Sequence, residues 1–144
     1  MPERPQSFDA ALCLQVPDLV ENDPLFFDAV KTALRPGGIL FVTVTNRASY
    51  KAVMRKWLGR GKPQLETIQF SQVNVYQASV AELIARADAC GFQLQASVGF
   101  NWLPFAKGSN SKLINPAAKA ERLLGLRGAA GISPWAMLHF ALGE

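Results

Sequence analysis

The chain has 144 residues, of which 49% are hydrophobic and 18% are charged. This length suits one domain, and the composition supports a packed core and excludes a wholly disordered chain. No apolar run reaches the roughly 18 residues that a membrane-spanning helix needs, and the first residues lack the apolar stretch of a signal peptide. We therefore expect a cytoplasmic protein.

Residue types that often carry chemistry are scarce. Cys13 and Cys90 both lie in apolar segments, which predicts reduced core cysteines rather than a disulfide or a metal site. The single histidine, His139, has no second metal ligand or nucleophile motif that points to it. We expect a packed or edge histidine and no metal site.

The net charge of +4 is concentrated in one segment. Residues 47–62 include six basic residues and no acidic one: Arg47, Lys51, Arg55, Lys56, Arg60 and Lys62. Three interpretations stay open. The segment is a solvated helix face, a site for an anionic group on a small substrate or carrier, or a surface that binds nucleic acid or anionic membrane. Binding that weakens steeply with salt would favour the last two.

Hydrophobic periodicity and capping signals divide the chain into alternating elements. In chain order these are a strand over 7–16, a helix over 24–34, a strand over 39–45, a helix over 47–58, a helix over 79–91, a strand over 92–99, a helix over 115–124 and a strand over 135–142. Residues 63–77 give no clear pattern. Apolar strands that alternate with helices predict an α/β layered fold with a largely parallel sheet.

The first strand and the turn before the second have distinct signals. Residues 7–16 are almost continuously apolar after Asp9, which predicts a strand buried on both faces. The helix over 24–34 must stop before Pro36, because proline pushes the preceding residue out of the α region. Gly37 and Gly38 then make the turn.

The helix over 47–58 is predicted to be amphipathic. Asn46 is a suitable cap for its first turn. Its apolar residues recur at helical spacing, which predicts a stripe packed on the core: Tyr50, Val53, Met54 and Trp57. The basic residues occupy the other side.

The helix over 79–91 and the strand after it are the clearest elements of the second half. Ser79 and Glu82 have the spacing of a capping box, and Gly91 suits the C-terminal end. The predicted buried stripe consists of Val80, Leu83, Ile84 and Ala87. Apolar and polar residues alternate over 92–99, which predicts a half-exposed strand near a sheet edge.

Three motifs occur in a characteristic order. A strand that opens with Phe8-Asp9 and a helix precede Leu34-Arg35-Pro36-Gly37-Gly38, and a later helix ends in Ala89-Cys90-Gly91-Phe92. From Ser7 onward the chain resembles the class I S-adenosylmethionine-dependent methyltransferase family. The resemblance implies part of a Rossmann-like methyltransferase sheet, in which the last strand, Trp135 to Leu142, is inserted antiparallel. It also implies S-adenosylmethionine as the cofactor.

The match begins at the family's fourth strand. The family builds most of its cofactor site on its first two strands, with a Gly-rich turn and an acidic residue for the ribose, and residues 1–144 contain no such segment. We therefore expect a single partial methyltransferase-like domain without the N-terminal cofactor-binding half, and an isolated chain that is inactive. The strand over 8–15 would present an unpaired apolar edge, and one sheet face would be bare. We expect a second copy or a partner chain to cover them.

Candidate site residues lie at the carboxyl ends of the strands, where open α/β sheets bind ligands. By resemblance, Leu14 and Gln15 border the cofactor. Asn46 and Arg47 follow the second strand, and with Tyr50 and Trp102 they are candidates for binding the methyl acceptor. Each also has a structural interpretation, such as a strand end, a helix cap, a core stripe or a loop anchor.

Two functions remain in view. The first is methyl transfer from S-adenosylmethionine to an unidentified acceptor, by a truncated or split form of the enzyme. No catalytic residue is assigned, because methyl transfer depends mainly on alignment and exclusion of water. The second is a non-catalytic binding or assembly module whose basic helix, 47–62, takes an anionic partner. Nucleic-acid binding through the same segment is a weaker third interpretation.

Overall fold

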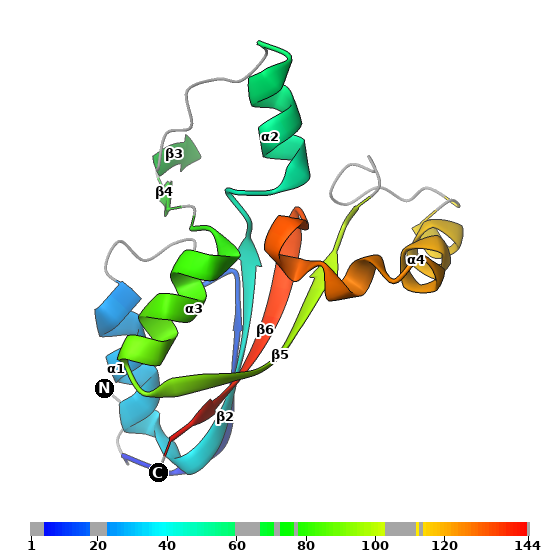
Figure 1. Cartoon of the computed structure of the whole chain (residues 1–144). Helices are drawn as coiled ribbons and strands as arrows, with labels where there is room; N and C mark the ends of the chain where they lie inside the picture. Colours follow the sequence, from blue (N-terminus) through cyan, green and yellow to red (C-terminus); the bar gives the residue numbers. More distant parts are fainter. Residues whose placement is uncertain are drawn as a thin grey trace.

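The computed structural model describes residues 5–17, 23–59, 67–70, 73–76, 78–102, 112 and 114–143. The elements along the chain are β1 (Phe8–Leu14), α1 (Asp23–Ala33), β2 (Leu34–Thr45), α2 (Tyr50–Trp57), β3 (Thr67–Phe70), β4 (Val73–Tyr76), α3 (Val80–Ala89), β5 (Phe92–Phe100), α4 (Ile114–Leu123), the short 3-10 turns η2 (Leu126–Gly128) and η3 (Ala130–Ile132), and β6 (Trp135–Leu142). Figure 1 shows their arrangement. The predicted order of strands and helices is confirmed, with small shifts at the ends.

The main sheet has four strands in the order β1-β2-β6-β5. β1 runs parallel to β2, while β6 lies between β2 and β5 and runs antiparallel to both. The α/β fold with a mixed sheet and an antiparallel last strand is therefore confirmed. Within the described residues, β1 and β5 are the two edge strands.

A β-hairpin occupies part of the stretch that the sequence pattern left unassigned. β3 and β4 pair antiparallel, from Thr67↔Tyr76 to Phe70↔Val73. The two strands form a separate two-stranded sheet.

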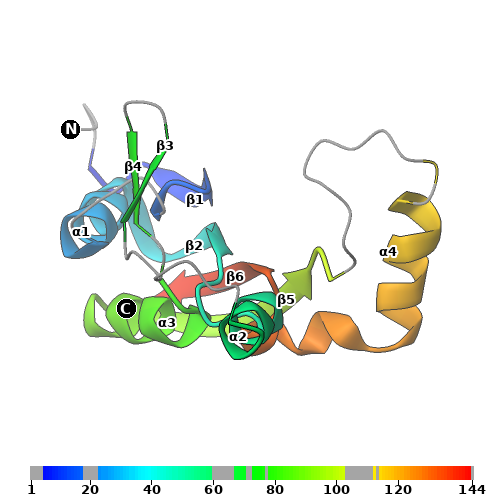
Figure 2. The same ribbon diagram turned by 90° about the horizontal axis from the view of Figure 1, so that it is seen from above.

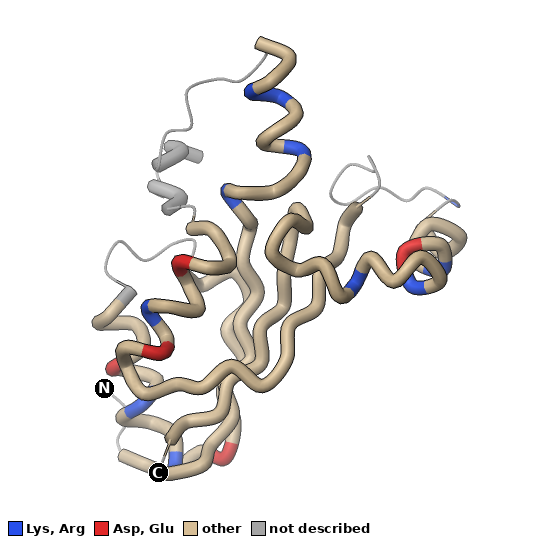
Figure 3. Tube along the Cα trace, viewed as in Figure 1, with Lys and Arg blue, Asp and Glu red and all other residues tan. Residues whose placement is uncertain are grey.

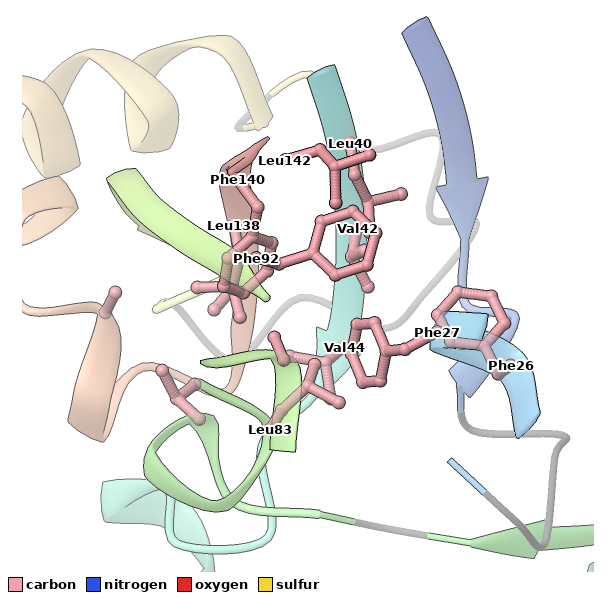
Figure 4. Packing of buried hydrophobic residues seen from close by; sticks show 14 of the residues in the cluster. Phe26, Phe27, Leu40, Val42, Val44, Leu83, Phe92, Leu138, Phe140 and Leu142 are labelled. Carbon is pink, nitrogen blue, oxygen red and sulfur yellow. The ribbon is translucent and has the colours of Figure 1, made fainter. Parts of the chain in front are cut away.

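The core lies on one face of the main sheet, between its strands and the helices α1 and α3 (Figure 4). Its largest fully buried side chains are Phe27, Phe92, Phe140, Leu34, Leu40, Leu83, Leu138, Val42 and Val44. The stripe predicted for α3 is confirmed, with Val80, Leu83 and Ala87 buried and Ile84 packed against the cluster. Burial of this apolar surface is the main term that favours the fold.

β2 begins at Leu34, earlier than the predicted start at residue 39. Leu34 already pairs with Phe8, and the regular pairing resumes only at Ala10↔Ile39, so residues 35–38 form an irregular excursion. Gly37 has φ 72° there, a conformation that glycine adopts without strain. A Cβ atom on Gly38 would lie 2.8 Å from the Arg35 carbonyl oxygen. The Pro-Gly-Gly turn is thus required by backbone geometry.

The opposite face of the sheet is open. Cross-strand pairs place Leu12 beside Phe41, and Phe41 beside His139. The His139 ring stacks on Phe41 with centroids 4.7 Å apart, which confirms a packed histidine. Among the described elements no helix covers this face (Figure 2). It is an apolar surface that faces solvent.

The prediction that β1 is buried on both faces is wrong for this chain. Phe8, Leu12 and Leu14 are 51%, 65% and 56% exposed. Two causes combine: β1 is an edge strand, and Leu12 and Leu14, which pair with Phe41 and Thr43, lie on the open face. Ala11 and Cys13, on the other side of the strand, pack against the core.

The packing predicted for α2 is also wrong. None of its residues is buried, and Trp57 is 86% exposed. The helix continues beyond the end of β2 and away from the sheet (Figure 1). Apart from Tyr50, which stacks on Trp102, the apolar stripe therefore meets no described part of the core, although its helical spacing is as predicted.

Two remaining sequence expectations concern cysteines and membranes. Cys13 and Cys90 are free thiols. Burial is the main cause that raises the pKa of each, and for Cys90 the nearby Asp28 carboxylate adds to it. In the described part of the chain, no helix is long and apolar enough to cross a membrane.

Candidate functional site

The carboxyl ends of β1, β2 and β5 lie at one edge of the sheet, because these three strands run in the same direction. This edge is where open α/β sheets bind ligands. The residues just after the three strands therefore define the candidate site, and Leu14, Gln15, Asn46, Arg47 and Trp102 are among them.

Gln15 turns the chain sharply at the end of β1. Its φ of 59° lies in the left-handed region, which non-glycine residues adopt rarely. Its backbone N–H donates to Thr43 Oγ1 at 2.9 Å, which links the end of β1 to β2. Leu14, one residue earlier, is 56% exposed. At the two positions predicted to border the cofactor, Leu14 thus presents an exposed apolar side chain, and Gln15 forms a backbone turn that is fixed by its hydrogen bond to Thr43.

Asn46 joins the end of β2 to the segment that enters β6. Its side-chain Nδ2 donates to the carbonyl oxygens of Gly131 and Ser133, both at 2.9 Å. Its Oδ1 accepts from the Ala48 N–H at 3.0 Å, and the residue is 3% exposed. The structure corrects one prediction, because the N-cap of α2 is Ser49. Asn46 instead links its own turn, at Ala48, to the segment over 131–133 that leads into β6.

Arg47 binds the carboxylate of Glu82 on α3. Glu82 completes the capping box, which is confirmed: its Oε2 accepts from the Ser79 N–H at 2.7 Å, and its N–H donates to Ser79 Oγ at 3.2 Å. The Ser79 N–H is the main cause that lowers the pKa of Glu82, and Arg47 adds to it. Arg47 therefore connects the start of the α2 segment to α3.

Tyr50 and Trp102 are brought together, although they lie far apart in sequence. Their rings stack with centroids 5.5 Å apart and an interplanar angle of 14°. The Tyr50 hydroxyl donates to the Trp102 carbonyl oxygen. Trp102 is 8% exposed, and its indole Nε1 is buried without a hydrogen-bond partner among the described residues. The pair fixes the base of α2 against the end of β5.

Lys51 and Glu121 complete this cluster. Lys51 Nζ donates to the Asn101 carbonyl oxygen at 2.9 Å, and Asn101 itself has φ 64°. Glu121, on α4, is 7% exposed and accepts from the Trp102 N–H at 2.8 Å. The segment after β5, at Asn101 and Trp102, thus contacts the base of α2 and the buried Glu121 carboxylate of α4.

The cluster changes the proton affinities of its members. Burial raises the pKa of the Tyr50 hydroxyl, and the Glu121 carboxylate adds to it. Burial also lowers the pKa of Lys51, as does the neighbouring Arg55, while Glu121 acts in the opposite direction. A raised pKa keeps the Tyr50 hydroxyl protonated and able to donate its hydrogen bond.

Sequence reasoning missed Ser49, Thr43 and Glu121. Ser49 had a usable signal, since serine is a common N-cap residue. Its Oγ accepts from the Ala52 N–H at 3.4 Å. Thr43 and Glu121 had none: a threonine in an apolar strand predicts β-structure, and a lone glutamate in a basic helix predicts solvent exposure. Their burial follows from tertiary packing.

At the ends of β1, β2 and β5 the described residues supply apolar side chains, backbone turns and hydrogen-bonding groups. Among the described residues there is no group of three possible metal ligands. Arg60 and Lys62 of the predicted basic segment lie outside the described residues.

The chain has the fold of the class I S-adenosylmethionine-dependent methyltransferases, and its sheet reproduces part of their Rossmann-like sheet. This conclusion rests on similar solved structures. No protein-family model and no curated protein sequence matches the chain.

One such structure is a methyltransferase from Thermotoga maritima, with a TM-score of 0.64 and 15% identity over 98% of this chain and 59% of that one. A second is the methyltransferase in a Haloferax volcanii complex with the Trm112 methyltransferase activator, with a TM-score of 0.58 and 12% identity over 100% of this chain and 57% of that one.

A third is a Haemonchus contortus phosphoethanolamine N-methyltransferase in complex with S-adenosyl-L-methionine, with a TM-score of 0.52 and 11% identity over 98% of this chain and 34% of that one. At these identities the likeness shows the fold alone. The chain spans less than two thirds of the length of each of these structures.

Proposed function

We propose that residues 1–144 form the acceptor-side part of an S-adenosylmethionine-dependent methyltransferase domain, which transfers a methyl group to an acceptor still to be identified. The observation that carries the proposal is the sheet order β1-β2-β6-β5 with an antiparallel β6. This order combines with the structural likeness to methyltransferases.

S-adenosylmethionine is the proposed cofactor, and it would supply an electrophilic methyl group on its sulfonium. The described residues fit one side of such a ligand. Leu14 offers exposed apolar surface, and the left-handed turn at Gln15 is held by Thr43. The remaining part of the cofactor site would come from strands that continue the sheet beyond β1. One methyltransferase of similar fold contains the cofactor.

The acceptor would lie over the ends of β2 and β5. Asn46 and Arg47 are proposed to shape this region from the β2 side, and Tyr50 and Trp102 from the β5 side. The stacked Tyr50–Trp102 pair makes a rigid aromatic wall. Rigid walls favour methyl transfer, because the reaction requires the acceptor atom to be aligned with the methyl group.

A second copy or a partner chain is proposed to cover the β1 edge and the open sheet face. An edge strand with exposed apolar side chains is a template for pairing, and Phe8, Leu12 and Leu14 are all more than half exposed. One methyltransferase of similar fold forms a complex with an activator protein. A cytoplasmic location of the assembly also stays a prediction.

The test compares the isolated chain with the assembly recovered from its native cells by an affinity tag. Light scattering gives the oligomeric state, and calorimetry measures binding of S-adenosylhomocysteine. We expect the assembly to bind the ligand and the isolated chain to bind it weakly or not at all. If the isolated chain binds with micromolar affinity, the partial-site proposal is wrong. If neither binds, the methyltransferase proposal is wrong.

One observation favours a second function, that of a non-catalytic module with a basic helix for an anionic partner. In the described residues, α2 bears basic side chains and no acidic ones, and it packs on the domain only at its base. An assembly that fails to bind S-adenosylhomocysteine yet depends on Arg55 and Lys56 for partner binding would favour this function over methyl transfer.

A further inference from the structure

α2 presents an apolar stripe that no described part of the chain covers. Tyr50, at its base, packs on Trp102. The rest of the stripe is exposed: Val53 by 60%, Met54 by 53%, Trp57 by 86% and the adjoining Leu58 by 52%. We call these four residues the α2 stripe. Helical geometry places them on one side of the helix, and gathered exposed apolar residues mark an interaction surface.

The other side of α2 is basic. Lys51, Arg55 and Lys56 are its charged residues, and the helix contains no acidic one. Figure 3 shows only basic positions along α2, whereas α3 carries both signs. Lys51 is engaged at the base by the Asn101 carbonyl. Arg55 and Lys56 are exposed in the last turn, and neither forms an ion pair with a residue that the structure describes.

Cations and apolar residues therefore occur together at the end of α2 that points away from the sheet (Figure 1). This combination suits an anionic lipid surface. Tryptophan and aliphatic side chains enter the headgroup region, while arginine and lysine contact lipid phosphates. A nucleic acid would use the cations but leave the aliphatic side chains in water. A neutral membrane would use the stripe but not the charge.

We infer that the outer part of α2 and its C-cap, residues 53–58, dock the protein on an anionic lipid surface. The α2 stripe enters the interface, and Arg55 and Lys56 bind lipid phosphates. One short helix gives weak, reversible binding, so the interaction depends on both the anionic lipid content and the salt concentration. The inference concerns where the protein acts and does not depend on the methyltransferase proposal.

The test is co-sedimentation of the full chain with phosphatidylcholine vesicles, with or without phosphatidylglycerol. We expect binding only to the anionic vesicles, and weaker binding as salt is added. Replacing both cations, Arg55→Glu with Lys56→Glu, is expected to weaken binding roughly thirtyfold or more, because each basic residue near an anionic surface contributes about a factor of five. Trp57→Ser should also weaken it, because the most exposed apolar residue of the stripe is lost.

Matched controls come from α4. Leu123 is 86% exposed, the same as Trp57, so Leu123→Ser removes equally exposed apolar surface elsewhere. Lys119→Glu with Arg122→Glu makes the same change of charge on α4. Both controls should keep the binding of the parent chain, and circular dichroism should show that every variant is folded. Equal losses in the α2 and α4 variants would mean general electrostatic adsorption and would overturn the inference.

A fluorescence measurement reports the depth of insertion. Emission from Trp57 should shift to the blue on binding anionic vesicles, and Trp57→Phe should remove the shift while Trp102 and Trp135 remain. No binding to either type of vesicle would overturn the inference. So would α2-dependent binding to duplex DNA, or to an acidic protein, by a chain that does not bind anionic vesicles.

Discussion

α2 and α3 have nearly the same spacing of apolar residues, but α3 packs on the core and α2 is exposed to solvent. Each begins at a serine N-cap, Ser49 or Ser79, and each repeats apolar residues at helical spacing. In α3 the stripe is buried at Val80, Leu83 and Ala87. In α2 no residue is buried. The pattern that predicts an amphipathic helix is therefore the same in both, and the packing is not.

The difference lies in where each helix runs. α3 runs back along the sheet, so its apolar side meets β5, α1 and η3. α2 continues beyond the end of β2 (Figure 1), and its base, at Tyr50 and Lys51, contacts the segment that follows β5. Periodicity thus identifies which side of a helix is apolar, but it does not identify what lies opposite that side.

The sharpest test of this comparison is a pair of leucines. Leu83 in α3 is 0% exposed, whereas Leu58, next to α2, is 52% exposed. Leu83→Ala should lower the free energy of unfolding by about 3 kcal/mol, because it removes buried apolar atoms and leaves a cavity. Leu58→Ala should change it by no more than about 0.5 kcal/mol. Urea unfolding of the two variants measures the difference, and equal losses would show that the α2 stripe is packed in solution.

The second-largest expected effect concerns Asn46, in the segment between β2 and α2. Asn46→Ala should lower the free energy of unfolding by about 2 kcal/mol, because the buried carbonyls of Gly131 and Ser133 lose their donor. Asn46→Asp keeps the acceptor for Ala48 but loses the same donors, so it should be no more stable than Asn46→Ala. A stability close to that of the parent chain in both variants would contradict the role assigned to this side chain.

Much of the fold could be predicted because it depends on local signals. The capping box at Ser79, the stop at Pro36 and the apolar run of the last strand each act within a few residues. The burial of β1 could not be predicted, since it depends on whether another strand lies beyond its edge. The start of β2 was missed because Leu34 pairs with Phe8 across the chain.

Less of the candidate site could be predicted. The strand ends pointed to Tyr50 and Trp102 as candidates, and the structure brings these two side chains together. The helix-cap role of Asn46 was predicted incorrectly, because the cap is Ser49 and the partners of Asn46 at Gly131 and Ser133 are distant in sequence. The buried Glu121 had no signal at all, since its partner is the backbone N–H of Trp102.

The two caps offer a test of intermediate size. Ser79→Ala should lower the free energy of unfolding by about 1 kcal/mol, because α3 is part of the core and loses its capping hydrogen bond. Ser49→Ala removes the corresponding bond of α2. Because α2 packs little, this change should mainly speed hydrogen exchange of the α2 amides and leave global unfolding nearly unchanged. A similar global loss in both variants would show that the two helices unfold as one unit.

The smallest effect is the pH dependence of the α3 cap. The Ser79 N–H holds the pKa of Glu82 below its ordinary value of 4.5, with Arg47 as a lesser cause. A lowered folded-state pKa means that the carboxylate stabilises the fold above pH 4.5, and that this stability is lost as the pH falls through the folded-state value.

Glu82→Gln should therefore be less stable than the parent chain at neutral pH and equal to it in acid. The difference should be about 0.5 kcal/mol, because solvent screens a carboxylate side chain that is 39% exposed. Arg47→Met separates the causes, since it removes the ion pair but keeps the hydrogen bond from Ser79. Most of the pH dependence of stability should remain in the Arg47→Met variant. If the pH dependence is lost there, the ion pair between Arg47 and Glu82, and not the hydrogen bond from Ser79, is its main cause.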